Sequence, residues 1–317
     1  MKIVILDGHA LNPGDLSWEF LREFGTYTFY ERTETEEETI RRIGDAELIL
    51  LNKVPITARV LDACPSVRLI CVLATGYNVV DVEAARQRGV TVCNVPDYGT
   101  AAVAQFTFAL LLELCHRVGH HDGAVHKGKW SACPDFSFWD TPQMELAGKT
   151  FGIIGFGRIG RAVGRIARAF GMEVLAYNRS RCPEGEQIGT YTDLDTLLRR
   201  SDIVSLHCPL TAQTQEMIRG AAIEKMKDGA ILLNTARGPL VDEKAVLEAL
   251  ERGKLRGYAA DVVCQEPIPE DSCLLKAPNC ILTPHMAWAP LESRQRILDI
   301  TKKSIRAFLE GEPVNTV

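Results

Sequence analysis

The chain lacks three features that would assign it to large classes of protein. Its 317 residues contain no apolar run that approaches the roughly twenty residues needed to span a bilayer. Its formal charge is −5, with acidic and basic residues interleaved, so there is no basic field that would attract nucleic acid. Its ten cysteines include no C-x-x-C pair, so neither a zinc site nor a disulfide framework is indicated. We expect a cytoplasmic protein with reduced cysteines that binds a small molecule and no metal, membrane or nucleic acid.

Short apolar segments alternate with helical segments along the whole chain. Strands are expected at 2–6, 27–30, 48–51, 69–72, 91–94, 173–177, 203–206, 230–234, 257–261 and 280–282. This alternation predicts an α/β fold with parallel sheets. The acidic run 34–38 is expected to open a helix that ends at Ile43, with Thr35 and Glu38 at capping-box spacing.

Two long helical segments suggest how the chain is divided into domains. Residues 103–114 are apolar with helical periodicity, and a last helix is expected from Leu291 to about Leu309. The last helix can return the chain to the first domain, which would then be discontinuous. We predict a substrate domain made of 1–98 and 288–317, and a dinucleotide-binding domain of 99–287 inserted within it.

The most informative motif is the glycine turn at 155–160. The apolar run beginning at Phe151 enters a G-x-G-x-x-G sequence formed by Gly155, Gly157 and Gly160, and an amphipathic stretch follows as far as Phe170. A dinucleotide pyrophosphate requires this strand, turn and helix, because the glycines permit close backbone approach and the helix N-terminus offers N–H groups. The motif predicts a bound nicotinamide cofactor.

The end of the second strand of this unit bears on which cofactor is bound. An acidic residue about twenty positions beyond the glycines selects NAD, because it bonds the ribose hydroxyls and repels a 2′-phosphate. This chain has Asn178, followed by Arg179, Ser180 and Arg181. The arginines suit the 2′-phosphate of NADP, or they are solvated loop residues and Asn178 bonds the ribose of NAD. The sequence leaves both cofactors open.

Three polar residues that follow predicted strands are candidates for catalysis. They are Arg237 after 230–234, Glu266 after 257–261 and His285 after 280–282. Ligands of such sheets bind beyond the carboxyl ends of the strands. A guanidinium suits a 2-oxo acid carboxylate, and an imidazole oriented by a carboxylate suits proton transfer. Taken singly, each residue is better explained by a structural role: a surface salt bridge for Glu266, a helix cap for Arg237 and a core position for His285. Their occurrence after three successive strands favours catalysis.

The chain resembles the D-isomer-specific 2-hydroxyacid dehydrogenases over nearly its whole length. The glycine turn, the segments 207–211 and 226–243, the Glu266-Pro267 pair and the segment 283–285 carry the resemblance. It implies a Rossmann domain inserted into a flavodoxin-like, discontinuous substrate domain, and a homodimer formed through the linking helix and the following loop. It also implies that Arg237 binds and polarises the substrate, that His285 is the general acid/base, and that Glu266 is its partner.

The same resemblance implies the binding residues. Those for the cofactor, NAD or NADP, are Thr100, Gly155, Gly157, Arg158, Ile159, Gly160, Asn178, Arg179, Ser180, His207, Cys208, Pro209, Thr214, Thr235, Ala236, Asp261 and His285. Those for the substrate are Leu73, Ala74, Thr75, Gly76, Arg237, His285 and Trp288.

Within the family, the segments 73–78, 134–139 and 285–288 most resemble glycerate dehydrogenases, also called hydroxypyruvate reductases. The expected substrate is therefore hydroxypyruvate or glyoxylate, reduced to D-glycerate or glycolate. Phosphoglycerate and D-lactate specificity remain alternatives, as does a non-enzymatic, NAD-sensing corepressor. The aromatic stretch 130–142 is expected to be buried against this chain or a second subunit, and Trp139 either lines a pocket or is structural.

Overall fold

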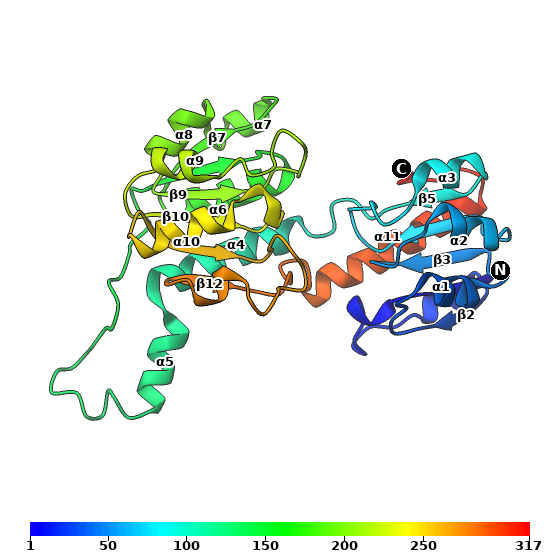
Figure 1. The fold of residues 1–317 in the computed structure, drawn as a ribbon, viewed down its shortest axis with the longest axis horizontal. Helices are drawn as coiled ribbons and strands as arrows, with labels where there is room; N and C mark the ends of the chain where they lie inside the picture. The colour runs from blue at the N-terminus through cyan, green and yellow to red at the C-terminus, as the bar shows by residue number, and fades with distance from the viewer. The chain divides into compact units, whose positions relative to one another are not determined.

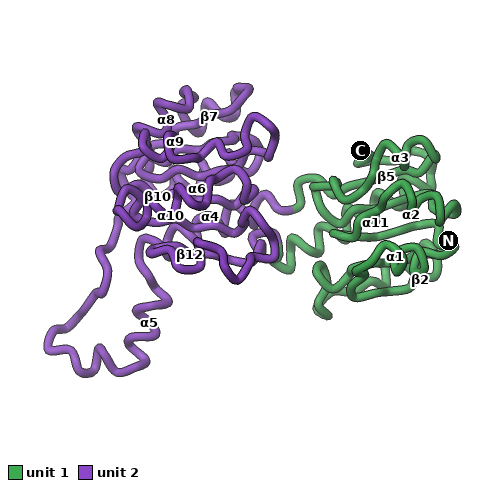
Figure 2. Tube along the Cα trace, viewed as in Figure 1, with its two compact units in different colours: residues 1–98, 289–317 green, residues 99–288 purple.

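Two parallel β-sheets organise the computed structural model, which describes residues 1–317 (Figure 1). The chain divides into unit 1, made of Met1–Tyr98 with Ala289–Val317, and unit 2, Gly99–Trp288 (Figure 2). Unit 1 is thus discontinuous in sequence. Trp288, which the sequence analysis placed in the substrate domain, groups with unit 2.

The sheet of unit 1 has five strands in the order β2-β1-β3-β4-β5. The strands are β1 (Lys2–Ile5), β2 (Thr26–Phe29), β3 (Leu48–Leu51), β4 (Leu69–Val72) and β5 (Thr91–Cys93). All four pairings are parallel, and every residue of β3 and β4 is buried, as expected for central strands covered on both faces. This strand order is that of flavodoxin-like folds.

Helices α1 (Glu36–Ile43), α2 (Ala58–Ala63), α3 (Val82–Gln87) and α11 (Leu291–Leu309) complete unit 1, with 3₁₀ turns at Gly8–Ala10 and Glu19–Glu23. The Thr35 side chain caps α1 by accepting from the Glu38 N–H. The Glu38 carboxylate accepts from the Glu34 N–H. The predicted cap therefore forms, and its return bond reaches one residue earlier than in a standard capping box.

The sheet of unit 2 has seven strands in the order β12-β11-β10-β9-β6-β7-β8, and all of its pairings are parallel. The strands are β6 (Thr150–Ile154), β7 (Glu173–Tyr177), β8 (Thr190–Tyr191), β9 (Ile203–Leu206), β10 (Ala230–Asn234), β11 (Leu255–Ala260) and β12 (Cys280–Leu282). From β6 the chain adds β7 and β8 on one side of the sheet, and then crosses back to add β9 to β12 on the other side of β6. The strand order therefore reverses between β6 and β9. This is the doubly wound Rossmann order, and the predicted fold class is confirmed.

Helices cover both faces of this sheet. Helices α4 (Thr100–His116) and α6 (Arg158–Ala169) share one buried core, to which Leu111 and Val163 belong. Helices α8 (Leu194–Arg200), α9 (Gly220–Lys225) and α10 (Glu243–Glu251) share another. A short α7 (Pro183–Glu186) and 3₁₀ turns at Gly238–Leu240 and Cys273–Lys276 complete the unit.

Helix α5 (Val118–His126) differs from the other helices of unit 2 because none of its residues is buried. It follows α4 after Arg117, which has a left-handed conformation (φ 50°). Figure 1 shows α5 and the following loop projecting from the rest of unit 2. The sequence analysis did not anticipate this helix, because its polar residues show no apolar periodicity.

No single helix is long and apolar enough to cross a membrane. Helices α4 and α5 together meet that length and composition, but they are bent by 56° at Arg117. All ten cysteines are free thiols; Cys64, Cys71, Cys93 and Cys115 are buried, Cys264 is exposed, and the other five are half-buried.

Candidate functional site

The glycine turn lies where the strand order of unit 2 reverses, between the ends of β6 and β9. Gly155 has φ +94°, and a Cβ on it would lie 2.4 Å from the backbone nitrogen of Cys208. A Cβ on Gly160 would lie 2.2 Å from the carbonyl oxygen of Gly155. Only glycine fits at both positions, so the fold itself requires these two residues.

Gly157 is different, because nothing in the chain requires it to be glycine. Its φ is −75°, an ordinary value, and a Cβ there would meet no atom within 4 Å. Its backbone is exposed, and it precedes α6 without a capping side chain. The open space at Gly157 leaves room for a phosphate to approach the N-terminus of α6. The glycine turn and the start of α6 therefore fit a dinucleotide pyrophosphate. Arg158 and Ile159 are the first two residues of that helix, and Ile159 packs on its core.

Asn178, at the end of β7, joins the glycine turn to the next loop. Its Oδ1 accepts a hydrogen bond from the Phe156 N–H at 3.1 Å, and its Nδ2 donates to the Ser180 carbonyl at 2.8 Å. Arg179 and Ser180 are exposed beside it. The side chain carries no charge that would repel a phosphate at this edge.

The loop after β9 carries His207, Cys208, Pro209 and Thr214. Burial lowers the pKa of His207 to about 3, so this imidazole is neutral at physiological pH, and it pairs with the Ser205 hydroxyl at 2.8 Å. Burial raises the pKa of the half-buried Cys208 thiol. The Thr214 hydroxyl donates to the Pro209 carbonyl at 2.8 Å, which closes the loop.

Asn234, the last residue of β10, shapes the loop that carries Arg237. Its Nδ2 donates to the Arg237 carbonyl at 2.9 Å and its Oδ1 accepts from the Ala236 N–H at 3.1 Å. Thr235 turns its hydroxyl to that of Thr107 in α4, at 3.0 Å. Thr100 is the first residue of the same helix. The Arg237 side chain is exposed, and its Nη1 donates to the Ala236 carbonyl at 2.6 Å.

Glu266 and His285 form a pair at the carboxyl edge of the same sheet. His285 Nδ1 lies 2.7 Å from Glu266 Oε2, and the other carboxylate oxygen accepts from the Val263 N–H at 3.2 Å. The side chains of His285 and Glu266 are 34% and 39% exposed, so both groups of the pair are accessible to solvent. A Cβ on Gly238 would lie 2.0 Å from the carbonyl carbon of Val263, so the loops that carry Arg237 and Glu266 touch through their backbones.

Asp261, the residue after β11, holds the turn that carries His285. It is 1% exposed. Its Oδ1 accepts from the Thr283 hydroxyl at 2.6 Å and the Met286 N–H at 2.9 Å, and its Oδ2 accepts from the Ala287 N–H at 2.7 Å. The resemblance assigns Asp261 to the cofactor; the structure gives its carboxylate three partners within unit 2.

Two further contacts complete this turn. The backbone N–H of His285 donates to the Asp261 carbonyl at 2.8 Å, although His285 is left-handed, with φ 52°. Trp288 Nε1 donates to the His285 carbonyl at 2.8 Å, which places the indole beside the histidine.

The predicted substrate loop lies at the carboxyl edge of the unit 1 sheet, after β4. Leu73 is buried and continues the ladder by donating to the Leu51 carbonyl at 2.7 Å. The carbonyls of Ala74 and Thr75 are both bonded within unit 1, whereas the N–H groups of Ala74, Thr75 and Gly76 have no partner in the chain. Successive N–H groups without a partner at the end of a strand are donors suited to an anion.

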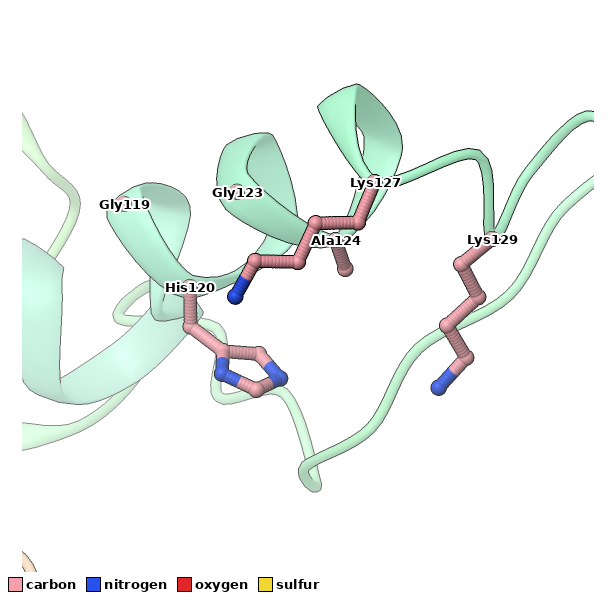
Figure 3. Close-up of a pocket in the computed structure, with 6 residues that line it drawn as sticks. All are labelled: Gly119, His120, Gly123, Ala124, Lys127 and Lys129. Carbon is pink, nitrogen blue, oxygen red and sulfur yellow. The ribbon is translucent and has the colours of Figure 1, made fainter.

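A hollow of about 380 Å³ lies on α5, away from these residues (Figure 3). It is lined by Gly119, His120, Gly123, Ala124, Lys127 and Lys129. The His120 and Lys129 side chains both bond the Asp140 carboxylate, whose negative charge offsets that of Lys129. The hollow contains none of the predicted site residues.

Sequence analysis missed Asn94, Asn234 and the structural role of Asp261. Asn94 and Asn234 lie at strand ends, where the rule used to select Arg237 would also have selected them. Their amides were passed over because only charged groups and histidine were considered as chemical groups.

Comparison with known proteins identifies relatives that cover the whole chain. Residues 108–287 match the family model described as D-isomer specific 2-hydroxyacid dehydrogenase, NAD binding domain. A hydroxypyruvate reductase from Blautia hydrogenotrophica is 52% identical, covering 100% of this chain and 99% of its own. A glycerate dehydrogenase from Methylorubrum extorquens is 40% identical, covering 100% and 98%. The crystal structure of a protein from Thermus thermophilus has a TM-score of 0.87 at 35% identity and covers 100% of both chains.

Proposed function

Because this chain belongs to the D-isomer specific 2-hydroxyacid dehydrogenase family and is an NAD(P)-dependent oxidoreductase, we propose that it reduces hydroxypyruvate or glyoxylate to D-glycerate or glycolate. The names of the two relatives, hydroxypyruvate reductase and glycerate dehydrogenase, support this substrate class over a phosphoglycerate or D-lactate specificity. The pairing of His285 with Glu266 is the observation that carries the proposal.

His285 is the proton donor to the ketone oxygen in reduction and the acceptor in oxidation. A carboxylate only accepts hydrogen bonds, so His285 donates its Nδ1–H to Glu266, and Nε2 is left to exchange a proton with the substrate. Glu266 also stabilises the positive charge of the protonated ring. The nicotinamide, when bound, supplies or accepts the hydride. His207 is neutral near pH 7 and does not compete as the acid.

Arg237 binds the substrate carboxylate and polarises the ketone. Its guanidinium is exposed at the end of β10, next in the sheet to the strand that leads to Glu266. Two parallel N–H bonds from a guanidinium match the geometry of a carboxylate. Within unit 1, the free N–H groups of Thr75 and Gly76 are donors that suit the carboxylate of an anionic substrate.

The cofactor site accepts NADPH as well as NADH. Asn178 places a neutral amide where a carboxylate would select NADH, and Arg179 is exposed next to it. Asn178 and Arg179 would hold the adenosine ribose, and Gly157 with the start of α6 would hold the pyrophosphate.

The test is a set of initial rates of NADH and NADPH oxidation with hydroxypyruvate, glyoxylate, pyruvate and a bulkier 2-oxo acid. We expect kcat/KM of about 10⁴ M⁻¹s⁻¹ or more for hydroxypyruvate or glyoxylate, the ordinary enzymatic range. A higher value for pyruvate would reassign the substrate. Slow turnover of every acid by a protein that binds cofactor would favour a cofactor-sensing regulator.

His285→Gln is the matched variant for this assay. Gln retains a hydrogen-bonding side chain but cannot act as an acid or a base, so both directions should slow by about 10²-fold to 10⁴-fold while NADH and NADPH still bind. Loss of cofactor binding in this variant would show that His285 has a structural role.

We also propose a homodimer. The resemblance implies pairing through the linking helix, which is α4, and the loop that follows; in this chain α5 and the loop after it are the exposed part of that region. Trp130, Phe136 and Trp139 in this loop are 52%, 91% and 68% exposed, and such an aromatic surface is typical of an interface. A second copy is the partner that the resemblance implies. Light scattering should give twice the chain mass, and Phe136→Ser with Trp139→Ser should shift the protein towards the monomer; a monomeric wild type would refute this.

A further inference from the structure

We propose that Asn94 is a positioning residue that sets the direction of the Gly76 N–H in the substrate-binding loop. The inference rests on the proposed function, because it assigns that N–H to the substrate carboxylate. It concerns contacts within unit 1 only.

The loop after β4 is held by the end of β5 at three points. Asn94 Nδ2 donates to the Thr75 carbonyl at 2.7 Å, the Val95 N–H donates to the Ala74 carbonyl at 3.0 Å, and the Thr75 hydroxyl donates to the Val95 carbonyl at 2.8 Å. β4 and β5 are parallel neighbours, so their ends meet at one edge. The second of these bonds joins two backbone groups, and the third comes from a side chain of the loop itself. Only the Asn94 bond comes from a side chain that follows β5.

Because the peptide group is planar, the hydrogen bonds to the Ala74 and Thr75 carbonyls also set the directions of the N–H groups that follow them. In a trans peptide the C=O of one residue and the N–H of the next point in opposite directions. The bond from Val95 to the Ala74 carbonyl therefore fixes the direction of the Thr75 N–H. The bond from Asn94 to the Thr75 carbonyl fixes the direction of the Gly76 N–H. Gly76, without a Cβ, has little conformational restriction of its own, so this peptide depends on the Asn94 anchor.

Asn94 is itself fixed from the opposite side. Its backbone N–H donates to the Asn315 carbonyl at 3.0 Å, and the Val317 N–H donates to the Val92 carbonyl at 3.0 Å. Cys93 and Thr316 form an antiparallel bridge between these two bonds. The segment 315–317 therefore holds the end of β5, and through Asn94 it holds the substrate loop.

Asn94→Asp tests the assignment with an isosteric change. A carboxylate cannot donate to the Thr75 carbonyl and repels it, so the Thr75–Gly76 peptide loses its anchor. We expect the KM for the best 2-oxo acid to rise about fivefold to tenfold, the effect of losing one hydrogen bond, with kcat within about twofold. The competitive inhibition constant of oxamate, a 2-oxo acid analogue that is not reduced, should rise by the same factor.

Asn94→Ala removes the anchor without adding charge and should raise both constants in the same way. Asn279→Asp is the matched control, because Asn279 lies in unit 2 and the new carboxylate can still accept from the Arg117 guanidinium, as the Asn279 Oδ1 does at 2.9 Å. It should leave both constants near the wild-type values. Cofactor dissociation constants and melting temperatures, measured for every variant, separate a local effect from a folding defect.

The outcomes distinguish the two proposals. Wild-type protein without turnover of any 2-oxo acid would refute the proposed function. Turnover by the wild type, with unchanged KM and oxamate inhibition in both folded Asn94 variants, would refute the role of Asn94 alone. Equal increases in the Asn279→Asp control would also refute it, because they would show an effect of the added charge that does not depend on the substrate loop.

Discussion

Asp261→Asn should destabilise unit 2 and displace His285 at the same time. The Asp261 carboxylate is 1% exposed and accepts three hydrogen bonds, from Thr283, Met286 and Ala287. Asparagine has the same shape, but one of its two terminal groups is an NH₂. Whichever orientation the amide takes, this NH₂ faces at least one buried N–H donor.

The magnitude follows from the contacts. A hydrogen bond to a charged group contributes about 1.5–3 kcal/mol, and an unsatisfied buried donor costs about 1–3 kcal/mol. Relaxation of the turn offsets part of this, so we expect the free energy of unfolding of unit 2 to fall by about 2–3 kcal/mol. For a domain of this size, that corresponds to a melting temperature lower by about 4–12 °C.

Differential scanning calorimetry and steady-state kinetics measure the two effects on the same preparation. Asp271→Asn is the control, because Asp271 is exposed on the same connection between β11 and β12. We expect kcat/KM to fall at least about tenfold in Asp261→Asn even well below its melting temperature, because the Glu266–His285 geometry is lost. A melting temperature and kcat/KM both equal to those of the control would refute the argument that Asp261 holds this turn.

Three further predictions concern single side chains. Arg237→Ala should lower kcat/KM on the best 2-oxo acid, corresponding to a loss of about 2–4 kcal/mol of transition-state stabilisation. An unchanged kcat/KM would remove Arg237 from the mechanism. Asn178→Asp should raise the ratio of kcat/KM with NADH to that with NADPH, because one oxygen still accepts from the Phe156 N–H while the added charge repels the 2′-phosphate; an unchanged ratio would mean that this side chain does not contact the ribose. Burial lowers the pKa of His207 from 6.5 to about 3, so between these two pH values the unfolded state binds more protons than the folded state. The free energy of unfolding should therefore fall as the pH falls from 6.5, by up to about 1.4 kcal/mol per pH unit. His207→Gln should show a shallower decline in urea unfolding titrations between pH 6.5 and 4, and parallel curves for the two proteins would contradict the burial argument.

The strands were predictable because each is a short apolar run bounded by turn residues. The strand expected at 203–206 begins and ends where predicted, and most of the others agree within one residue. The strand expected at 257–261 begins two residues earlier, at Leu255, because Arg256 lies between buried neighbours and interrupts the apolar run. The two-residue β8 offers too little sequence for any pattern.

The three candidate catalytic residues were predictable because the topology of parallel sheets requires their position. Once β10, β11 and β12 are neighbours in one sheet, the residues after them share an edge, and the pairing of Glu266 with His285 is a consequence. The cofactor turn was predictable for a related reason, since Gly155 and Gly160 satisfy a steric requirement of the fold itself.

The residues that hold the site could not be predicted in this way, because their role depends on pairs of loops from distant parts of the sequence. Asn94 contacts a carbonyl nineteen positions away, and Asp261 contacts a loop more than twenty positions away. Both are short polar side chains that form hydrogen bonds with backbone groups left unpaired where strands end. Which backbone groups these are is determined only when two strands become neighbours in the sheet. The topology of the sheet thus determines where the candidate catalytic residues lie, whereas their orientation depends on amide and carboxylate groups of neighbouring loops. Neither variant removes a reacting group. Variants at Asn94 should therefore change the affinity for the substrate, and Asp261→Asn should change the geometry of the Glu266–His285 pair; the changes in KM and kcat at the two positions measure these two effects separately.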